Sequence, residues 1–427
     1  MDAIITPRSL GGDIAAIPSK SHLHRLLICA ALGDLPLKIP YPVSVMPEDI
    51  RATVGCLASL GSDIKTEGDC LVVGPLDREA TSIAWLDCGE SGSTYRFLVP
   101  VVLALGRPAV FHLSARLPSR PMDDLFTALE AHGARIEGRG SPDVFVTGRI
   151  SPGKYIIPGN ISSQYVTGLL LALPLLPRDS EIIITGKRES QGYITMTLGV
   201  LREFSVDIKP TKTGYLIPAL QNFRSPKTIN PEGDWSNSAF WLAAGAIRGE
   251  GIRVTGLMRD TSQGDSAICE ALQRLGACVE TYGDYVAVSP GRLRGISIYA
   301  ADIPDLVPAI AAVAAAAEGV TVIEGAGRLR LKESDRLSSV SAALNALGGH
   351  AVSDSDSITI YGTGSLAGGR VDSYTDHRIV MMATVCSVIC KNTVTISGAE
   401  ATDKSYPGFF SDFAALGGRV IKGGGKT

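Results

Sequence analysis

A segment of about seventy residues recurs six times along the chain, and this periodicity limits the possible folds more than any other feature. The shared pattern is an apolar helical run followed by a short segment ending in Val or Ile, as in CLASLGSDI and ALQRLGACV. The residue after the helical run is glycine in five copies and serine in the third: Gly61, Gly133, Ser205, Gly276, Gly348 and Gly417. The intervals are 72, 72, 71, 72 and 69 residues. Each copy therefore predicts an amphipathic helix, a glycine that ends it, and a strand entering a hairpin.

Each copy also contains a second, more apolar helical run. RFLVPVVLALG and LVPAIAAVAAAA are apolar around most of their circumference, which is typical of buried helices. The polar heads of these runs begin near Ser21, Gly92, Ser163, Ser236, Asp305 and Asp376. We therefore expect an α/β chain of six units. A chain of 427 residues exceeds one ordinary core, which favours three units in each of two domains. A linear solenoid is the alternative, although its repeats are usually shorter than seventy residues.

The polar heads place hydroxyl, amide and cationic side chains at predicted helix N-termini. The cationic residues there and in nearby loops are Lys20, Arg25, Arg96, Arg120, Lys332, Arg336, Arg378 and Lys404. Helix N-termini favour anions, and the arginine fork binds two oxygens of a carboxylate or phosphate. The pattern predicts a site for ligands with several negative charges. Ordinary N-capping by the serines is the simpler alternative.

Two carboxylates stand among these cations. Asp305, in DIPDLVP, begins a proline-started helix, where N-capping is the alternative to a chemical role. Glu333, in RLKESDRL, could equally belong to a surface ion-pair network. In a site lined by cations, either carboxylate could act as a general acid or base.

Composition excludes several classes of function. The net charge is −3 and no dense basic run occurs, which argues against nucleic acid as a partner. The longest apolar stretches are too short to span a membrane, and the N-terminus lacks a secretory signal pattern. Eight scattered cysteines without a C-x-x-C pair predict free thiols in a reducing compartment, so a cytoplasmic protein is expected. No metal site is expected, because His22 and His24 form the one close histidine pair and no third ligand follows.

Two glycine-rich segments resemble nucleotide-binding motifs without matching them. The C-terminal GGGKT lacks the first glycine of a phosphate-binding loop, and we expect it to be a frayed tail. GTGSLAGG, at residues 362–369, has the wrong glycine spacing for a dinucleotide fingerprint.

Ten segments resemble those of the EPSP synthase (3-phosphoshikimate 1-carboxyvinyltransferase) family, in one order from Ser19 to Phe410. They are PSKSHLHR, GESGSTYRF, LPSRPMDDL, NISSQY, SQGYITMTL, EGDWSNSAFWLAAGAI, DIPDLVPAIA, RLKESDRL, TDHRIVMM and DKSYPGFF. The resemblance implies an α/β fold, a two-domain inside-out α/β barrel of six βαβαββ repeats, three per domain. It implies a discontinuous domain of residues 1–18 and 233–427, an inserted domain of residues 19–232, and an active site in the cleft between them.

The resemblance also implies an activity. The family transfers the enolpyruvyl group of phosphoenolpyruvate to the 5-hydroxyl of shikimate 3-phosphate, by addition and elimination, and releases phosphate. This reaction belongs to the shikimate pathway of aromatic amino acid biosynthesis. It uses no metal or organic cofactor, so none is expected here, and members are generally monomeric. The two substrates carry two phosphates and two carboxylates, which suits a site lined by cations.

Roles follow from the resemblance position by position. Asp305 is expected to be the base for the 5-hydroxyl, and Glu333, with Lys20, the group that protonates the methylene carbon. The residues expected to bind shikimate 3-phosphate are Lys20, Ser21, Arg25, Ser162, Ser163, Gln164, Ser190, Tyr193, Asp305 and Lys332. Those expected to bind phosphoenolpyruvate are Lys20, Gly92, Arg120, Gln164, Arg336, Arg378 and Lys404. Supporting positions are expected for Arg96, His377 and Glu90.

The chain departs from the family pattern at a few of these positions. Glu90 stands where many members carry asparagine, and Arg328 replaces a polar amide. An acidic Glu90 would repel an anionic substrate unless a cation offsets it. These departures bear on the affinity for substrates and leave the expected reaction unchanged.

Two alternative functions remain at this point. The related UDP-N-acetylglucosamine enolpyruvyl transferases share the fold, but they carry a cysteine in the loop that corresponds to LPSRPMD, and this chain has none there. The second alternative is a non-catalytic anion-binding protein that kept the fold. The joint presence of Lys20, Asp305 and Glu333 weighs against it.

Overall fold

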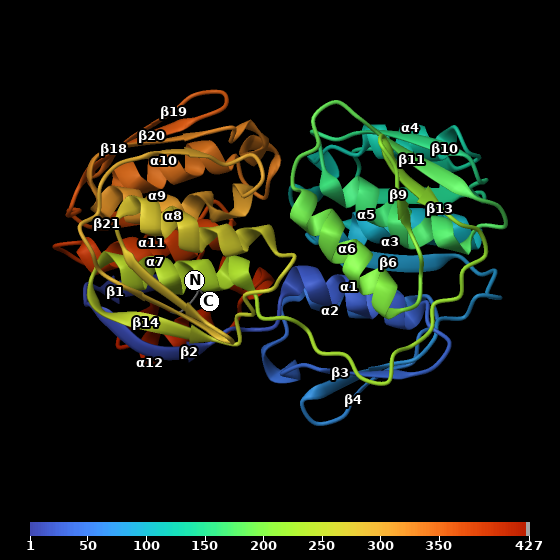
Figure 1. Ribbon diagram of the computed structural model, residues 1–427, viewed down its shortest axis with the longest axis horizontal. Helices are drawn as coiled ribbons and strands as arrows, with labels where there is room; N and C mark the ends of the chain where they lie inside the picture. Colours follow the sequence, from blue (N-terminus) through green and yellow to red (C-terminus); the bar gives the residue numbers. More distant parts are fainter. Residues whose placement is uncertain (424–427) are drawn as a thin grey trace. The chain divides into compact units, whose positions relative to one another are not determined.

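The computed structural model describes residues 1–423, which fold as two compact units. Of the described residues, unit 1 comprises Met1–Ser19 and residues 232–423, and unit 2 comprises Lys20–Pro231. Each unit is formed from small sheets and the helices that pack on them (Figure 1). The described residues contain six such sheets, and the expected α/β chain of six repeated units is thereby confirmed.

Unit 1 contains three four-stranded sheets within the described residues. The first sheet has the strand order β21 (Gly369–Asp372), β22 (Val394–Ser397), β1 (Asp2–Thr6) and β23 (Arg419–Gly423). The second has the order β15 (Cys278–Tyr282), β16 (Tyr285–Ser289), β14 (Gly249–Thr255) and β2 (Leu10–Ala15). The third has the order β17 (Ser297–Tyr299), β18 (Glu318–Glu324), β20 (Ile358–Thr363) and β19 (His350–Ser353). Its α-helices are α7 (Trp235–Ile247), α8 (Ile268–Leu275), α9 (Val307–Ala316), α10 (Arg336–Ala346), α11 (His377–Cys386) and α12 (Phe409–Ala415). Its 3₁₀ helices are η4 (Gly264–Ala267), η5 (Pro304–Leu306), η6 (Gly327–Leu331), η7 (Ser387–Ile389) and η8 (Ala399–Lys404).

Unit 2 has the same organisation, with one shorter sheet. Its first sheet has the strand order β3 (Leu37–Pro40), β5 (Cys70–Val73) and β4 (Ile64–Thr66). The second has the order β6 (Ala84–Gly89), β7 (Ala109–Leu113), β9 (Asp143–Thr147) and β8 (Arg135–Glu137). The third has the order β10 (Lys154–Pro158), β11 (Ser180–Thr185), β13 (Gly214–Ile217) and β12 (Lys209–Pro210). Its α-helices are α1 (Lys20–Ala31), α2 (Glu48–Ser59), α3 (Gly92–Leu105), α4 (Asp123–Glu130), α5 (Ser163–Ala172) and α6 (Gln191–Glu203). Its 3₁₀ helices are η1 (Val43–Val45), η2 (Leu117–Ser119) and η3 (Leu173–Leu175).

The two kinds of helix predicted in each repeat have the expected burial. Every residue of α9 from Val307 to Ala315 is buried, and α7, α9 and α11 contact one another inside unit 1. In α8 the buried side chains recur with helical spacing, at Ile268, Ala271, Leu272 and Leu275, so this helix buries one face only. The buried helices therefore form the core of a unit, and their N-terminal residues become available to form a site.

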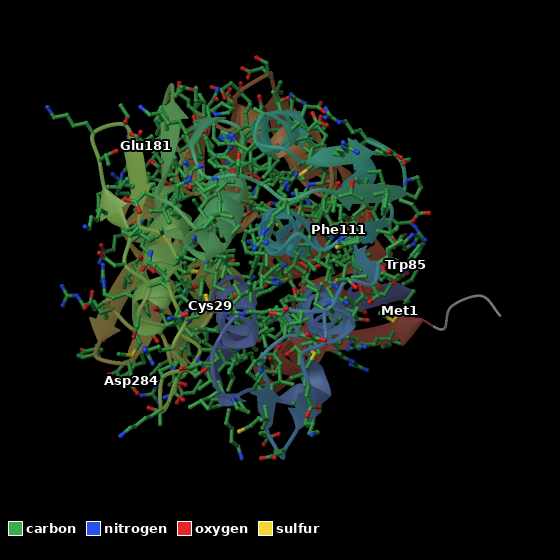
Figure 2. The ribbon with its side chains drawn as sticks, turned by 90° about the vertical axis from the view of Figure 1, so that its right-hand side faces the viewer. Met1, Cys29, Trp85, Phe111, Glu181 and Asp284 are labelled. Atoms are coloured by element: carbon green, nitrogen blue, oxygen red, sulfur yellow. The ribbon has the colours of Figure 1, made fainter. Side chains whose placement is uncertain are left out.

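Alternation along the strands sets which face of each sheet meets the core. Phe111 of β7 is fully buried, whereas Trp85 of the neighbouring β6 is 56% exposed (Figure 2). Successive side chains of a strand point to opposite faces, so one face of this sheet packs inward and the other contacts solvent.

Parallel pairing joins the strands that flank four of the buried helices, α3, α5, α9 and α11. β6 pairs in parallel with β7, β10 with β11, β17 with β18, and β21 with β22. The first repeat differs from the expected βαβαββ pattern, because its sheet, β3–β5–β4, has three strands in the described residues. The strand that precedes α1 is β2, and it pairs in parallel with β14 of unit 1 instead, with Asp13 opposite Arg253.

The residue that ends each amphipathic helix adopts a left-handed backbone, which explains the glycine at the period of the repeat. The φ angle is +93° at Gly61 and +105° at Gly133, and it is also positive, +61°, at Ser205, the one non-glycine member of the series. A side chain in this region costs roughly 1–2 kcal/mol.

We therefore expect Ser205→Gly to stabilise the protein. Relief of the left-handed strain outweighs the extra chain entropy of an unfolded glycine, and the free energy of unfolding should rise by roughly 0.5–1 kcal/mol. The reciprocal change Gly133→Ser, at the equivalent residue of another repeat, should lower it. Urea denaturation measures both. Equal or lower stability of Ser205→Gly would contradict the strain at this residue.

Candidate active site

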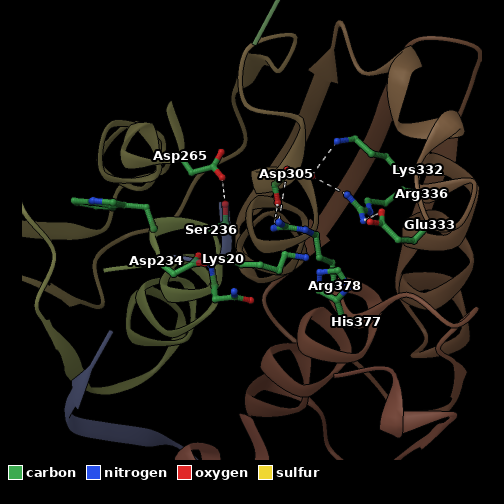
Figure 3. Close-up of polar contacts among 12 residues, drawn as sticks. Lys20, Asp234, Ser236, Asp265, Asp305, Lys332, Glu333, Arg336, His377 and Arg378 are labelled. Atoms are coloured by element: carbon green, nitrogen blue, oxygen red, sulfur yellow. Dashed lines mark hydrogen bonds and ion pairs between the residues drawn. The ribbon is translucent and has the colours of Figure 1, made fainter. Parts of the chain in front are cut away.

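In unit 1, three cations converge on the carboxylate of Asp305. Arg336 Nη1 lies 2.9 Å from Asp305 Oδ1, Lys332 Nζ lies 3.3 Å from the same oxygen, and Arg378 Nη2 lies 3.6 Å from Oδ2 (Figure 3). Arg378 Nη1 also donates to the backbone carbonyl of Asp305 at 2.8 Å. Four residues expected in the active site are thus in direct contact.

Arg336 is the centre of this cluster and is 1% exposed. Besides Asp305, its Nη2 lies 2.6 Å from Glu333 Oε2, and its Nε lies 2.9 Å from Asp376 Oδ2. Asp376 is fully buried, and the Ser334 hydroxyl donates to its Oδ2 at 3.0 Å. A single guanidinium therefore holds three carboxylates, which fixes the positions of the expected base, Asp305, and of the expected acid, Glu333.

The charges of the cluster set the protonation of its members. Burial raises the pKa of Asp305, but the charges of Arg378, Lys332 and Arg336 outweigh burial and hold this pKa well below its usual range. Burial lowers the pKa of Lys332, against the opposing charge of Asp305. Asp305 is therefore ionised at neutral pH, and Lys332 gives up its proton more readily than an exposed lysine.

Local structure explains how these side chains reach one another. Asp305 lies in η5, just before α9. The N-cap residues of these helices are Ile303 and Leu306, so Asp305 is not an N-cap and the capping alternative for this residue is wrong. Arg336 begins α10 after the N-cap Asp335, whose side chain accepts from the Ser338 amide. Arg378 lies at the start of α11, after the N-cap Asp376.

The surface ion-pair alternative for Glu333 is wrong as well. Its side chain is 14% exposed and pairs with the buried Arg336. The neighbouring Arg330 does form an ion pair of the more exposed kind, with Asp335 at 2.6 Å.

Two further residues expected in the active site lie in unit 1. His377 is buried at the start of α11, with its Nδ1 4.0 Å from Asp376 Oδ1. Lys404 is buried at the end of η8, which packs against α11. Arg328, in η6, is close enough to Lys332 for its charge to lower the pKa of that lysine, after the larger effects of burial and Arg336.

In unit 2, Lys20 forms a short ion pair at the start of α1. Its Nζ lies 2.5 Å from Asp49 Oδ2, a carboxylate in the first turn of α2. Both side chains are largely buried. The ion pair fixes the ammonium group at the helix N-terminus, where an anion is also favoured.

Arg25 is fixed one turn further along α1. Its Nε donates to Thr197 Oγ1 at 2.8 Å, and its two terminal nitrogens donate to the carbonyls of Ser21 and Tyr193 at 2.5 and 3.1 Å. The guanidinium also lies 5.1 Å from the ring centroid of Phe97. Burial lowers the pKa of Arg25 to about 10, so it remains a cation at neutral pH.

Gly92 opens α3 among three of the expected residues. A Cβ atom at this position would lie 2.9 Å from Arg120 Nη1 and 3.1 Å from Arg96 Nη1, so both guanidinium groups reach the helix N-terminus. Arg96 Nη1 donates to Gln164 Oε1 at 2.8 Å. Gln164 Nε2 in turn donates to Ser93 Oγ at 2.9 Å, which joins the starts of α3 and α5.

The expected hydroxyl groups lie at neighbouring helix starts. Ser162 is the N-cap of α5 and accepts from the Gln164 amide, so the capping alternative holds for this serine, and Ser163 follows it. Ser190 occupies the N-cap position of α6 with a left-handed backbone and makes no side-chain cap bond. Tyr193 follows in α6, and Glu90 lies partly exposed just before α3.

The sequence did not predict a role in the site for two carboxylates of these clusters. Asp376 directly precedes His377 and Arg378, and its place in TDHR is the one signal that could have found it. Asp49, the partner of Lys20, has no such signal, because an acidic residue in the first turn of a helix is common for electrostatic reasons alone.

Metal ligands, membrane-spanning helices and thiols can also be assessed in the described residues. Within residues 1–423, no group of three or more His, Cys, Asp or Glu side chains is arranged to hold a metal ion. Over the same range, no helix has both the length and the apolar composition needed to cross a bilayer. All eight cysteines lie in this range and are free thiols. The GGGKT tail, expected to fray, lies outside the described residues beyond Gly423.

Comparison with known proteins gives one consistent result. The family model for EPSP synthase (3-phosphoshikimate 1-carboxyvinyltransferase) matches residues 4–413. The 3-phosphoshikimate 1-carboxyvinyltransferase of Clostridium kluyveri is 38% identical over 420 residues, which cover 97% of both chains. That of Clostridium perfringens is 38% identical over 426 residues, which cover 98% of this chain and 99% of the relative.

Solved structures agree with the sequence comparisons. The EPSP synthase of Acinetobacter baumannii superposes with a TM-score of 0.81 at 25% identity, covering 99% of this chain and 100% of that one. The enolpyruvyl transferase NikO of Streptomyces tendae, at a TM-score of 0.79 and 19% identity, shares the fold. The expected enolpyruvyl transferase fold is confirmed. By its family match and its full-length similarity to curated members, this chain belongs to the EPSP synthase (3-phosphoshikimate 1-carboxyvinyltransferase) family.

Proposed function

We propose that the clusters of both units act together on phosphoenolpyruvate and shikimate 3-phosphate, and that Asp305 and Glu333 carry the proton transfers. The activity is that of the family, 3-phosphoshikimate 1-carboxyvinyl transfer in the shikimate pathway. The single observation that carries the proposed roles is the contact of Arg336 with both Asp305 and Glu333. One cation, expected to bind phosphoenolpyruvate, thus sets the positions of a base and of an acid.

The substrates change the environment of Asp305. Each substrate carries a phosphate and a carboxylate, and these anions compete with Asp305 for Lys332, Arg336 and Arg378. As the cations turn to the substrates, they stabilise the ionised form of Asp305 less, and its pKa rises. Substrate binding therefore makes Asp305 a stronger base at the moment when a base is needed.

The addition step needs one base and one acid. Asp305 takes the proton of the 5-hydroxyl while that oxygen bonds to C2 of phosphoenolpyruvate. Glu333, with Lys20, gives a proton to the methylene carbon, which becomes a methyl group. The product of this step is a tetrahedral intermediate whose phosphate is bound by the cations.

The elimination step reverses the proton transfer at carbon. Glu333 removes a proton from the methyl group, the C2=C3 double bond forms again, and the bond from C2 to the phosphate oxygen breaks. The proton taken by Asp305 leaves with the phosphate. Positioning of the substrates and stabilisation of the developing charges add to the rate enhancement that the two proton transfers supply.

Phosphate release from the purified full-length protein tests the proposed function. We expect release that requires both phosphoenolpyruvate and shikimate 3-phosphate. Release with UDP-N-acetylglucosamine in place of shikimate 3-phosphate would overturn the proposal that shikimate 3-phosphate is the acceptor. No release with either acceptor would favour an anion-binding protein without turnover.

Substitution of Gly92 by alanine is expected to weaken binding of phosphoenolpyruvate. The new Cβ, 2.9 Å from Arg120 Nη1, forces that guanidinium to move. Because the guanidinium ends a flexible side chain, it can move at little cost to the fold, but it then leaves the position where it is expected to bind phosphoenolpyruvate. A hydrogen bond to a charged group contributes about 1.5–3 kcal/mol, so KM for phosphoenolpyruvate should rise about tenfold or more, with a smaller change in KM for shikimate 3-phosphate. Gly55→Ala in α2, where a Cβ meets nothing within 4 Å, is the matched control. Equal increases in both KM values would contradict the assignment of Gly92 to one substrate.

We further propose that the chain acts as a monomer in the cytoplasm. All proposed catalytic residues lie on one chain, and free cysteines suit a reducing compartment. Sedimentation at the mass of two chains would contradict the monomer.

A further inference from the structure

Asp265 is a buried carboxyl close to the proposed base, and no expected role includes it. It lies in η4 and is 4% exposed. The hydroxyl of Ser236, at the start of α7, donates a hydrogen bond to its Oδ2 (Figure 3). The 3₁₀ helices that carry the two carboxylates, η4 and η5, both pack against α7. A Cβ atom at Gly264, next to Asp265, would lie 3.6 Å from the backbone carbonyl of Asp302, so Asp265 and Asp305 lie on neighbouring segments. The charges of Asp305 and Arg378 both act on Asp265. An ionisable group with this burial, beside a proposed base, calls for a physical explanation.

A network of hydrogen bonds fixes the segment that carries Asp265. The side-chain amide of Gln263 donates to Glu232 Oε2 and to the Gly233 carbonyl, both at 2.8 Å. Gln263 Oε1 accepts from the Trp235 amide at 3.2 Å. The segment is thus tied to the start of α7, and Asp265 is held in place beside Ser236.

We propose that Asp265 is a positioning residue for Asp305, and that its negative charge opposes the cations around Asp305 and keeps that carboxylate basic enough to accept the proton of the 5-hydroxyl. This inference rests on the proposed role of Asp305 as the base. Asp265 acts through Asp305 and Arg378 and takes no proton from a substrate.

Electrostatics supply the reason. Three cations make Asp305 a weak base, and the negative charge of Glu333 opposes them. The charge of Asp265 acts in the same direction as that of Glu333, because two neighbouring carboxylates raise each other's affinity for protons. The interaction is reciprocal. Burial and then the charge of Asp305 raise the pKa of Asp265 to about 6, while Arg378 and the Ser236 hydrogen bond act in the opposite direction, and Asp234 adds a further rise. Lys332, Glu333 and Arg336 are the other charged groups around Asp305.

The rate is expected to fall as the pH falls through the pKa of Asp265. Above pH 6 Asp265 is ionised and supports Asp305; as the pH falls through about 6, Asp265 becomes protonated and its support is lost. The rate should therefore fall through this step, in addition to any fall caused by the substrate phosphates, whose second ionisation also lies near pH 6. The substrate contribution is identical for all variants, so a difference between variants isolates the protein group.

The test compares pH profiles of kcat for the wild type and Asp265→Asn. The variant resembles the protonated form at every pH. We expect its kcat at pH 8 to be about 3- to 10-fold lower, as for a base weakened by roughly one pKa unit, and the step near pH 6 to be smaller. KM for both substrates should change less than twofold, and Asp265→Glu should restore the step. Asp412→Asn is the matched control, since Asp412 is a half-buried carboxyl that accepts the Tyr406 hydroxyl.

Each outcome separates this inference from the proposed function. Superimposable profiles for Asp265→Asn and the wild type, together with an inactive Asp305→Asn, would overturn the inference and leave the proposed function intact. An active Asp305→Asn would overturn the proposed base and the inference with it. Should Asp265→Asn fail to fold, Ser236→Ala serves instead, because loss of its hydrogen bond should move the step to higher pH. An unmoved step in Ser236→Ala would overturn the inference.

Discussion

Asp305→Asn is expected to lower kcat by about 10²- to 10⁴-fold, the range for loss of a general base. Asparagine keeps the shape of the side chain but cannot accept the proton of the 5-hydroxyl. It also removes the negative charge with which the substrates compete for Lys332, Arg336 and Arg378. The dissociation constants of both anionic substrates should therefore stay equal or fall. Initial rates and equilibrium binding of shikimate 3-phosphate measure the two effects separately.

Asp302→Asn provides the matched control for this substitution. Asp302 lies three residues earlier and is exposed, so kcat should change less than twofold. A value of kcat for Asp305→Asn within tenfold of the wild type would contradict its role as the base. Weaker substrate binding by Asp305→Asn would contradict the competition for cations.

Arg336→Met has the largest expected effect on stability. Methionine fills a similar volume but leaves Asp305, Glu333 and Asp376 without the cation that they share. Removal of one member of a buried ion pair costs about 3–5 kcal/mol, so the free energy of unfolding should fall by about that amount at neutral pH. Asp305 loses one of the cations that hold its pKa low, so it takes up a proton at higher pH in the variant than in the wild type. The deficit should therefore shrink as the pH falls through the pKa that Asp305 has in the variant.

Urea denaturation at pH 7 and pH 5 measures the loss of unfolding free energy at neutral pH and its expected decrease at lower pH. Arg292→Met is the control, because Arg292 pairs with Glu318 at 3.4 Å and both side chains are more than 70% exposed. Exposed pairs contribute about 0–1 kcal/mol. A loss below about 1 kcal/mol for Arg336→Met would show that the cluster does not depend on its central cation.

Local chemistry explains which parts of the fold could be predicted. The position after each amphipathic helix needs a left-handed backbone, so glycine marks it in five of six repeats and the period is visible in one sequence. The pairing of β2 with β14 could not be predicted. Asp13 and Arg253 lie 240 residues apart, and nothing local in either strand specifies its partner.

The candidate site also contains residues that the sequence predicts and residues that it does not. Asp305 and Arg378 could be predicted because each lies at a polar helix start, a pattern that occurs six times. Arg336 lies outside that pattern, and the resemblance of RLKESDRL to the family segment predicted it. Asp265 could not be predicted, since its role depends on a neighbour 40 residues away along the chain and on burial by a segment that Gln263 fixes. Partners contributed by distant segments become evident only in three dimensions.

The pairing of β1 has a consequence for synthesis of the chain. β1 lies between β22 and β23, with Asp2 opposite both Ser397 and Gly423. β1 is therefore synthesised almost 400 residues before β22 and β23, and its sheet cannot form until they have been made. At translation rates of about 5–20 residues per second, this delay is roughly 20–80 s. Residues 20–231, by contrast, are complete long before and can fold while unit 1 is still being made. During that interval both edges of β1 lack their partners and can pair with other chains, so β1 is a segment that molecular chaperones would protect.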